Sequence, residues 1–109
     1  MKIEKNEIKT KGIKLELIEN GEKIGRCFIY LIYNDLHDKP YALLEDVFIE
    51  ERYRGKGYGK LLVQEAIKLA KELGCYKIIA TSRFERENVH KFYEGLGFKK
   101  WGFEFRIDF

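Results

Sequence analysis

Polar and apolar residues alternate near the start of the chain, and this pattern predicts a half-buried strand. Residues 13–18 read IKLELI, which places Ile13, Leu15 and Leu17 on one face. Asn20-Gly21 follows, and this dipeptide tolerates the positive φ angles of a tight hairpin turn. We therefore expect a β-hairpin that leads into a second strand.

Two further strands are expected from longer apolar runs. Residues 24–33 read IGRCFIYLIY, which is typical of a strand buried on both faces. After a polar turn from Asn34 to Pro40, residues 41–50 again carry apolar side chains on both faces. Two acidic residues, Glu45 and Asp46, interrupt this third strand.

The second half of the chain changes to helical spacing. Apolar residues recur every three or four positions from Leu62 to Leu73, and Gly74 is the expected C-cap of this helix. We expect a short strand over residues 76–82 and a second helix from about Glu87 to Leu96.

The last nine residues return to strict alternation, which predicts a strand with one wet face. The element order β-β-β-α-β-α-β indicates an α/β fold with a mixed, mostly antiparallel sheet flanked by helices, in one domain over residues 1–109. The apolar residues of the last expected strand are Trp101, Phe103, Phe105, Ile107 and Phe109.

Composition narrows the class of protein. A charged fraction of 36% and an apolar fraction of 45% fit a globular domain and exclude a disordered tail. No stretch approaches the roughly 20 apolar residues that cross a bilayer, and residues 1–10 lack a secretory signal. Cys27 and Cys75 stand far apart without a paired His, so we expect reduced thiols, no metal site and a cytoplasmic location.

Residues 52–60, RYRGKGYGK, carry four cations, no anion and three glycines between a strand and a helix. Glycines let a backbone approach a phosphate closely, and the free N–H groups and dipole of a helix start attract anions. The ATP-binding P-loop is excluded because Leu61 stands where Ser or Thr would bind Mg²⁺. The third glycine comes one position too early for a dinucleotide fingerprint. The residue types therefore predict a phosphate-binding loop, and the alternative is a basic, solvent-exposed turn without a ligand.

The spacing Arg54-x-x-Gly57-x-Gly59 after a strand resembles the acyl-CoA-binding motif of the GNAT superfamily of N-acetyltransferases. Residues 44–59, LEDVFIEERYRGKGYG, look like that motif in spermidine/spermine-type members. Residues 92–98, FYEGLGF, are similar to the end of the family's later helix. The resemblance covers roughly Ile13 to the C-terminus. It implies acetyl transfer from acetyl-CoA to a primary amine, on the acetyltransferase fold without most of its N-terminal helical unit.

The same resemblance implies roles for individual residues. Main-chain groups of the third strand would pair with the pantetheine arm like an added strand, and the Ile49 N–H would polarise the thioester carbonyl. N–H groups from Gly55 to Lys60 would hold the pyrophosphate. The expected binding residues are Val47, Phe48, Ile49, Arg54, Gly55, Lys56, Gly57, Tyr58, Gly59, Lys60 and Arg86.

Two side chains are candidates for proton transfer. Tyr93 falls on the position of the family's general acid, and a phenol keeps its proton at neutral pH. The alternative is that Tyr93 only completes the apolar stripe of its helix. Glu45 matches the position that contacts the substrate amine and is the candidate base, with Asp46 as the supporting acid. The alternative is that these carboxylates pair with cations across the sheet.

Several positions depart from the family pattern. Arg86 stands where many members have a CoA-contacting Asn, Asn88 is expected to cap the helix, and His90 is interpreted as structural. About a dozen residues precede Ile13, so we expect an acceptor site that is open or completed by a second subunit. The acceptor could be a small polyamine, an amino sugar or an exposed protein amine.

Two other functions are compatible with these residues. The first is a non-catalytic acyl-CoA-sensing module that docks on a partner protein. The second is a nucleic-acid-binding domain, but the net charge of +3 is small, and Glu50 and Glu51 adjoin the basic loop. A small sheet with an exposed edge also favours a homodimer.

Overall fold

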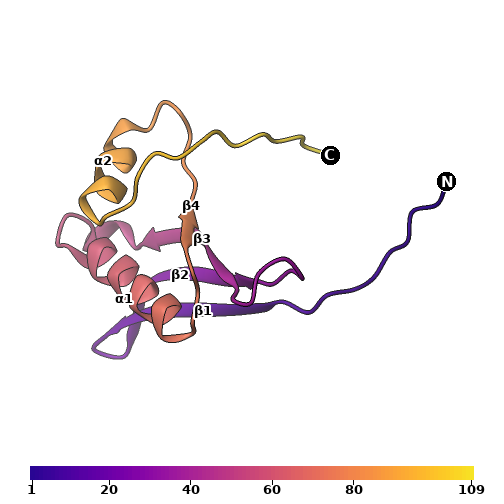
Figure 1. Cartoon of the computed structure of the whole chain (residues 1–109). Helices are drawn as coiled ribbons and strands as arrows, with labels where there is room; N and C mark the ends of the chain where they lie inside the picture. The colour runs from indigo at the N-terminus through magenta and orange to yellow at the C-terminus, as the bar shows by residue number, and fades with distance from the viewer.

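A four-stranded sheet forms the body of the protein in the computed structural model, which describes all 109 residues (Figure 1). The strand order is β1-β2-β3-β4, with antiparallel pairing throughout except for the parallel pair β3–β4. This architecture confirms the predicted mixed, mostly antiparallel α/β class. The elements are β1 (Lys11–Glu19), β2 (Glu22–Ile32), β3 (Tyr41–Ile49), η1 (Glu51–Tyr53), α1 (Tyr58–Glu72), β4 (Ile78–Ala80) and α2 (Glu87–Gly95).

The hairpin turn between β1 and β2 forms where it was predicted. Asn20 has a φ of 50° and Gly21 a φ of 78°, and both central residues of a type I′ turn need positive φ. Such a turn matches the right-handed twist of the strands that flank it.

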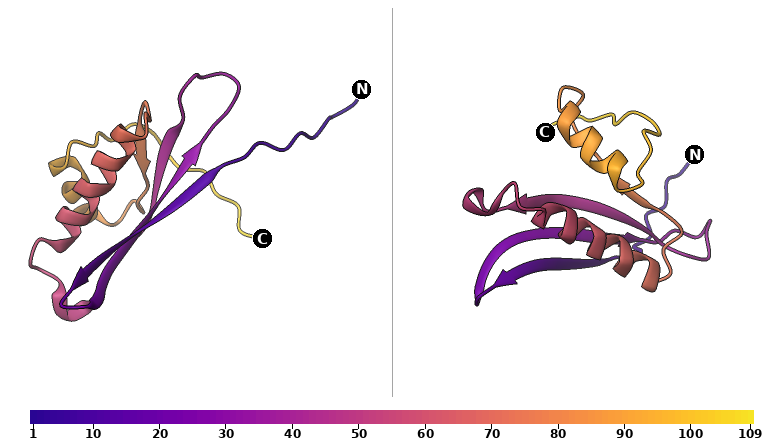
Figure 2. Two further views of the ribbon diagram at one scale, coloured as in Figure 1. Left: turned by 90° about the horizontal axis from the view of Figure 1, so that it is seen from below. Right: turned by 90° about the vertical axis from the view of Figure 1, so that its left-hand side faces the viewer.

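Both helices lie on one side of the sheet (Figure 2). The β2 residues Cys27, Ile29 and Leu31 are buried in one core cluster with Val63 and Ala66 of α1. The prediction that β2 is buried on both faces is therefore wrong. Its other face carries Arg26, Phe28 and Tyr30 without a covering helix, and the two rings stack with centroids 6.2 Å apart. Neither helix combines the length and apolar character needed to cross a bilayer.

The predicted helix ends are confirmed. Gly74 has a φ of 81°, and its N–H donates to the Lys71 carbonyl at 3.1 Å. The next N–H, of Cys75, donates to the Ala70 carbonyl at 3.0 Å, which completes a Schellman motif. The prediction that Asn88 caps α2 is wrong, because Arg86 occupies the N-cap position and no side chain bonds to the cap.

The expected C-terminal strand does not form, and β4 is shorter than predicted. Residues 99–109 leave α2 as an extended chain that runs clear of the sheet (Figure 1). The five apolar side chains of residues 101–109 are between 72% and 118% exposed. Alternation produces a strand only where a neighbouring strand supplies hydrogen bonds, and β4 pairs with β3 alone. The radius of gyration, 16.0 Å, exceeds the roughly 13 Å of a compact chain this long because both termini extend outwards.

The buried thiol of Cys27 makes the free energy of unfolding depend on pH in the alkaline range. Its side chain is 0% exposed, and burial raises its pKa from 9.0 to about 11. Because the folded state holds this proton more tightly than the unfolded state, the stabilisation is complete below pH 9 and is lost as the pH rises to 11. We expect the free energy of unfolding to fall by roughly 2 to 3 kcal/mol over that interval, measured by urea titration.

The control for this prediction is Cys27→Ala. This variant lacks the titrating thiol and leaves a small cavity, so it should be less stable near neutral pH, and its free energy of unfolding should vary less across the same interval. An unchanged pH dependence would contradict the assignment to Cys27.

Candidate active site

Beyond its pairing with β4, the backbone of β3 has an unpaired edge. The parallel pairing of β3 with β4 ends at Leu44 and Ala80, whereas β3 continues to Ile49. On the other edge, the Glu50 N–H donates to the Ile24 carbonyl of β2 at 2.8 Å. Successive peptide groups point to alternate edges. The N–H groups of Val47 and Ile49 therefore point to the unpaired edge.

An irregularity in β3 accompanies this change of pairing. Asp46 has a φ of 50° within the strand, and the register between β2 and β3 shifts between Arg26 and Phe28. One extra residue in β3 is thus accommodated as a β-bulge, which bends a strand and redirects its side chains. Phe48 returns to register opposite Arg26, so its main-chain groups face β2 and not the unpaired edge.

Two glycines of the glycine-rich loop have left-handed backbone conformations. Gly55 and Gly57 have φ values of 79° and 84°, and Gly57 is the N-cap of α1. The first intrahelical bond runs from the Leu61 N–H to the Gly57 carbonyl. The N–H groups of Tyr58, Gly59 and Lys60 therefore have no intrahelical acceptor and are oriented at the positive end of the helix dipole.

The cations of this loop have different environments. The Arg54 Nε donates to the Ile49 carbonyl at 2.7 Å, and its guanidinium lies 5.2 Å from the centre of the Phe48 ring. Arg52 forms an ion pair with Glu22 of β2. Arg54 thus joins the loop to the end of β3, whereas the exposed Lys60 forms no ion pair.

The loop, β3 and α2 converge at Gly59. A methyl group at this position would lie 3.9 Å from the Ile49 Cγ1 and 3.8 Å from the Phe92 Cζ. These are ordinary van der Waals distances, so the start of α1, the end of β3 and α2 pack together at this point.

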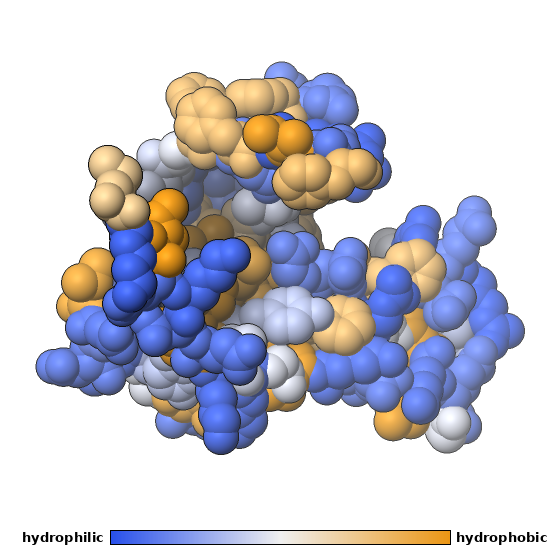
Figure 3. Space-filling view, turned by 90° about the vertical axis from the view of Figure 1, so that its right-hand side faces the viewer, coloured by the Kyte–Doolittle hydropathy of each residue, from blue (hydrophilic) through white to orange (hydrophobic).

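A cavity of about 450 Å³ opens beside the bulge (Figure 3). The bulge of β3, the segment after β4, α2 and the C-terminal segment all contribute to its walls. It brings together predicted residues from both halves of the chain, namely Glu45, Asp46 and Val47 of β3 with Arg86 and Tyr93. The lining residues that carry charge are Glu45, Asp46, Arg83, Arg86, Glu104 and Arg106.

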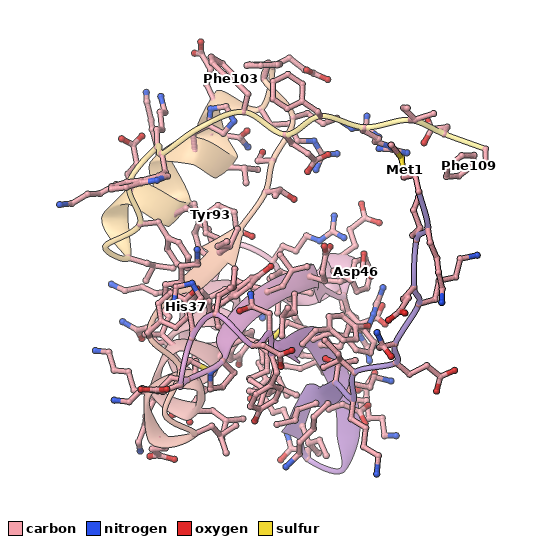
Figure 4. All side chains as sticks on the ribbon, turned by 45° about the vertical axis from the view of Figure 1, so that its right-hand side comes forward. Met1, His37, Asp46, Tyr93, Phe103 and Phe109 are labelled. Carbon is pink, nitrogen blue, oxygen red and sulfur yellow. The ribbon has the colours of Figure 1, made fainter.

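Tyr93 lies between α2 and the sheet (Figure 4). Its ring contacts those of Phe92 and Phe98 edge-on, with centroids 5.4 and 5.2 Å away. Burial raises the pKa of Tyr93 above 10.0, and the nearby Cys27 and Glu45 raise it further. Unlike the hydroxyls of Tyr53 and Tyr58, which bind Glu22 and Glu19, the Tyr93 hydroxyl forms no side-chain hydrogen bond. The phenol is protonated and its oxygen is available to a ligand.

The two predicted carboxylates lie on different parts of the bulge. Glu45 is half-buried opposite Phe28 of β2, and Asp46 is exposed. Neither forms an ion pair within 4.0 Å, so the alternative that they pair with cations across the sheet is wrong. The His90 ring contacts the Arg83 carbonyl at 2.8 Å and holds the segment before α2, in agreement with its structural interpretation.

Five polar residues of the cavity were not predicted as site residues from the sequence. Thr81, Ser82 and Arg83 follow β4, and the carboxyl end of a strand in a parallel pair is a signal for a binding site. Glu104 and Arg106 belong to the segment expected to pair in the sheet, so the sequence offered no signal for their place here. No group of three or more His, Cys, Asp or Glu side chains is arranged as metal ligands.

Comparison with known proteins places this arrangement in a family. Residues 3–98 match the Acetyltransferase (GNAT) family. A probable glucosamine 6-phosphate N-acetyltransferase from Drosophila melanogaster is 47% identical over 85 residues, which are 77% of this chain and 37% of that protein. The glucosamine 6-phosphate N-acetyltransferase of Trypanosoma brucei brucei is 38% identical over 65 residues, 60% of this chain and 42% of that protein. The chain thus spans about two fifths of the length of these curated relatives.

The fold agrees with that assignment. A putative acetyltransferase from Agrobacterium tumefaciens superposes with a TM-score of 0.75 at 35% identity, covering 84% of this chain and 66% of that structure. Since the family match extends over most of the sequence, from residue 3 to residue 98, this chain belongs to the GNAT acetyltransferase family.

Proposed function

We propose that the protein transfers the acetyl group of acetyl-CoA to the primary amine of a small molecule. The observation that carries this proposal is a cavity that Tyr93 and Glu45 both line, beside the unpaired edge of β3. A proton donor, a proton acceptor and free backbone N–H groups are what direct acyl transfer to an amine requires.

The donor would bind along the chain from β3 to α1. The main-chain groups of Val47 and Ile49 suit the amides of the pantetheine arm, which would extend the sheet as an added strand. The N–H groups from Gly55 to Lys60 suit the pyrophosphate, and Lys60 adds a positive charge. Arg54 contributes mainly by fixing the loop to Ile49.

The proposed reaction is a single displacement at the thioester. The amine nitrogen attacks the carbonyl carbon, a C–N bond forms, and the C–S bond breaks. The Ile49 N–H stabilises the oxyanion, and Glu45 accepts the proton that the nitrogen loses, directly or through water. Tyr93 donates its proton to the departing CoA thiolate. The products are an N-acetylated amine and CoA.

The charges in the cavity suit an acceptor that carries both an amine and an anion. Arg83, Arg86 and Arg106 could bind a phosphate, while Glu45 and Asp46 lie near the β3 edge for the amine. Two of the relatives above are named for glucosamine 6-phosphate. We therefore infer an amino sugar phosphate as the acceptor class.

Calorimetric titration with acetyl-CoA, followed by an acetylation assay on a panel of amines, tests this proposal. We expect saturable binding of acetyl-CoA and faster acetylation of glucosamine 6-phosphate than of glucosamine. Spermidine and a lysine peptide represent the other acceptor classes.

Each negative outcome has its own meaning. Absence of binding near a millimolar concentration of acetyl-CoA would contradict the donor site. Binding without acetylation of any amine would instead support the acyl-CoA-sensing module. Equal rates with and without the sugar phosphate would contradict the acceptor class alone.

A further inference from the structure

The cavity is lined from both faces of the sheet, because β3 and β4 no longer pair beyond Leu44. Tyr93 reaches it from the helix side, where its ring packs against the core cluster. Glu45 is directly opposite Phe28 in the antiparallel register, and residues opposite one another point to the same face of a sheet. Phe28 lies on the face that no helix covers (Figure 2), so the side chain of Glu45 belongs to that open face as well.

The two substrates of the proposed reaction would therefore approach Glu45 and Tyr93 from different sides. The loop that we assign to the pyrophosphate leads into α1, which covers the helix side of the sheet. The open face stays free for the amine. Phe28 is the aromatic side chain next to Glu45 on this face, and this step of the argument rests on the proposed function.

The ring of Phe28 is half-buried and already lies near one ammonium group. Lys14 of β1 places its Nζ 5.8 Å from the ring centre, and the Tyr30 ring lies parallel to that of Phe28 within 3°. The charge of Lys14 is partly balanced by Glu16, at 3.8 Å. A cation within about 6 Å of a ring centre is attracted by the negative face of the ring. On the β3 side, the direct neighbour of the ring is Glu45.

Glu45 is a half-buried carboxylate that forms no ion pair with any cation of the chain. A carboxylate beside an aromatic ring is complementary to an alkylammonium, since the first supplies hydrogen-bond acceptors and charge and the second a cation–π contact. We propose that Phe28, together with Glu45, binds the protonated amine of the acceptor and is a specificity-determining residue. A hydroxyl group at the same place gains neither contact.

The kinetic consequence separates Phe28 from Glu45. The ring stabilises the ammonium and not the neutral amine that attacks the thioester, so its effect belongs to the ground state. Phe28→Leu should raise the KM for the amine about fivefold without lowering kcat. Tyr30→Leu is the matched control, because it removes a ring from the same strand and face that is opposite Leu43 and not Glu45. Its KM should stay at the wild-type value.

Binding of the ammonium can be measured without turnover. Glucosamine 6-phosphate and glucose 6-phosphate differ by an ammonium in place of a hydroxyl. Calorimetric titration of each sugar in the presence of CoA, which has no acetyl group to transfer, gives the preference for the ammonium. We expect the wild type to prefer glucosamine 6-phosphate about tenfold and Phe28→Leu to lose most of this preference. Phe28→Trp keeps an aromatic ring and should retain it, as should Tyr30→Leu.

The outcomes distinguish this site from the reaction itself. An equal preference in the wild type and Phe28→Leu would overturn the proposal, and so would failure of both sugars to bind. Acetylation of an amine with a KM that Phe28→Leu leaves unchanged would also overturn it, while the proposed acetyl transfer would stand. Conversely, a preference that depends on Phe28 in a protein that acetylates no amine would support this site and contradict the function.

Discussion

Replacing Tyr93 by Phe is expected to lower kcat for acetyl transfer by about a hundredfold or more. The substitution removes one hydroxyl and keeps the ring that packs edge-on against Phe92 and Phe98. The fold should therefore survive, and the affinity for acetyl-CoA should change little. The CoA thiolate would then have to take its proton from water, which is poorly positioned for that transfer.

The pH profile connects this effect to the phenol. Because burial raises the pKa of Tyr93 above 10.0, the proton donor stays protonated and causes no loss of kcat below that pH. Tyr30→Phe is the matched control, since Tyr30 lies on the open face of the sheet and lines no part of the cavity. An unchanged kcat in Tyr93→Phe would show that this side chain only completes the apolar stripe of α2.

Replacing Gly57 by Ala is expected to weaken acetyl-CoA binding about tenfold. Gly57 has a φ of 84°, where an L side chain costs about 1 to 2 kcal/mol. No heavy atom of the protein lies within 4 Å of the added methyl group, so the methyl would occupy open space at the start of α1. Both the strain and the methyl would disturb the N–H groups of Tyr58 and Gly59 that we assign to the pyrophosphate.

Gly74→Ala separates binding from stability. Gly74 has a φ of 81° and is equally free of contacts, but it lies at the opposite end of the same helix. Both variants should lose a similar free energy of unfolding, and only Gly57→Ala should lose affinity for acetyl-CoA in calorimetry. Equal affinities in the two variants would contradict the assignment of the loop to the donor.

Features that depend on neighbours in the chain could be predicted from the sequence. The Asn20-Gly21 turn, the Gly74 helix end and the positive φ of Gly57 follow from backbone sterics, which act over a few residues. Residues of the candidate site could be predicted from the sequence for a related reason. Tyr93 and Glu45 were identified through the motifs around them, although nothing local indicated that they line one cavity.

Tertiary contacts determined which strand faces are covered and which segments pair in the sheet. An apolar run does not reveal whether a second layer covers it, so the open face of β2 became visible only once both helices lay on one side. The end of β3–β4 pairing at Leu44 coincides with the bulge at Asp46, which the sequence did not predict. The alternation of residues 101–109 indicated an extended chain with one apolar face, but a strand also needs a pairing partner, and in the folded chain these residues pair with no other strand.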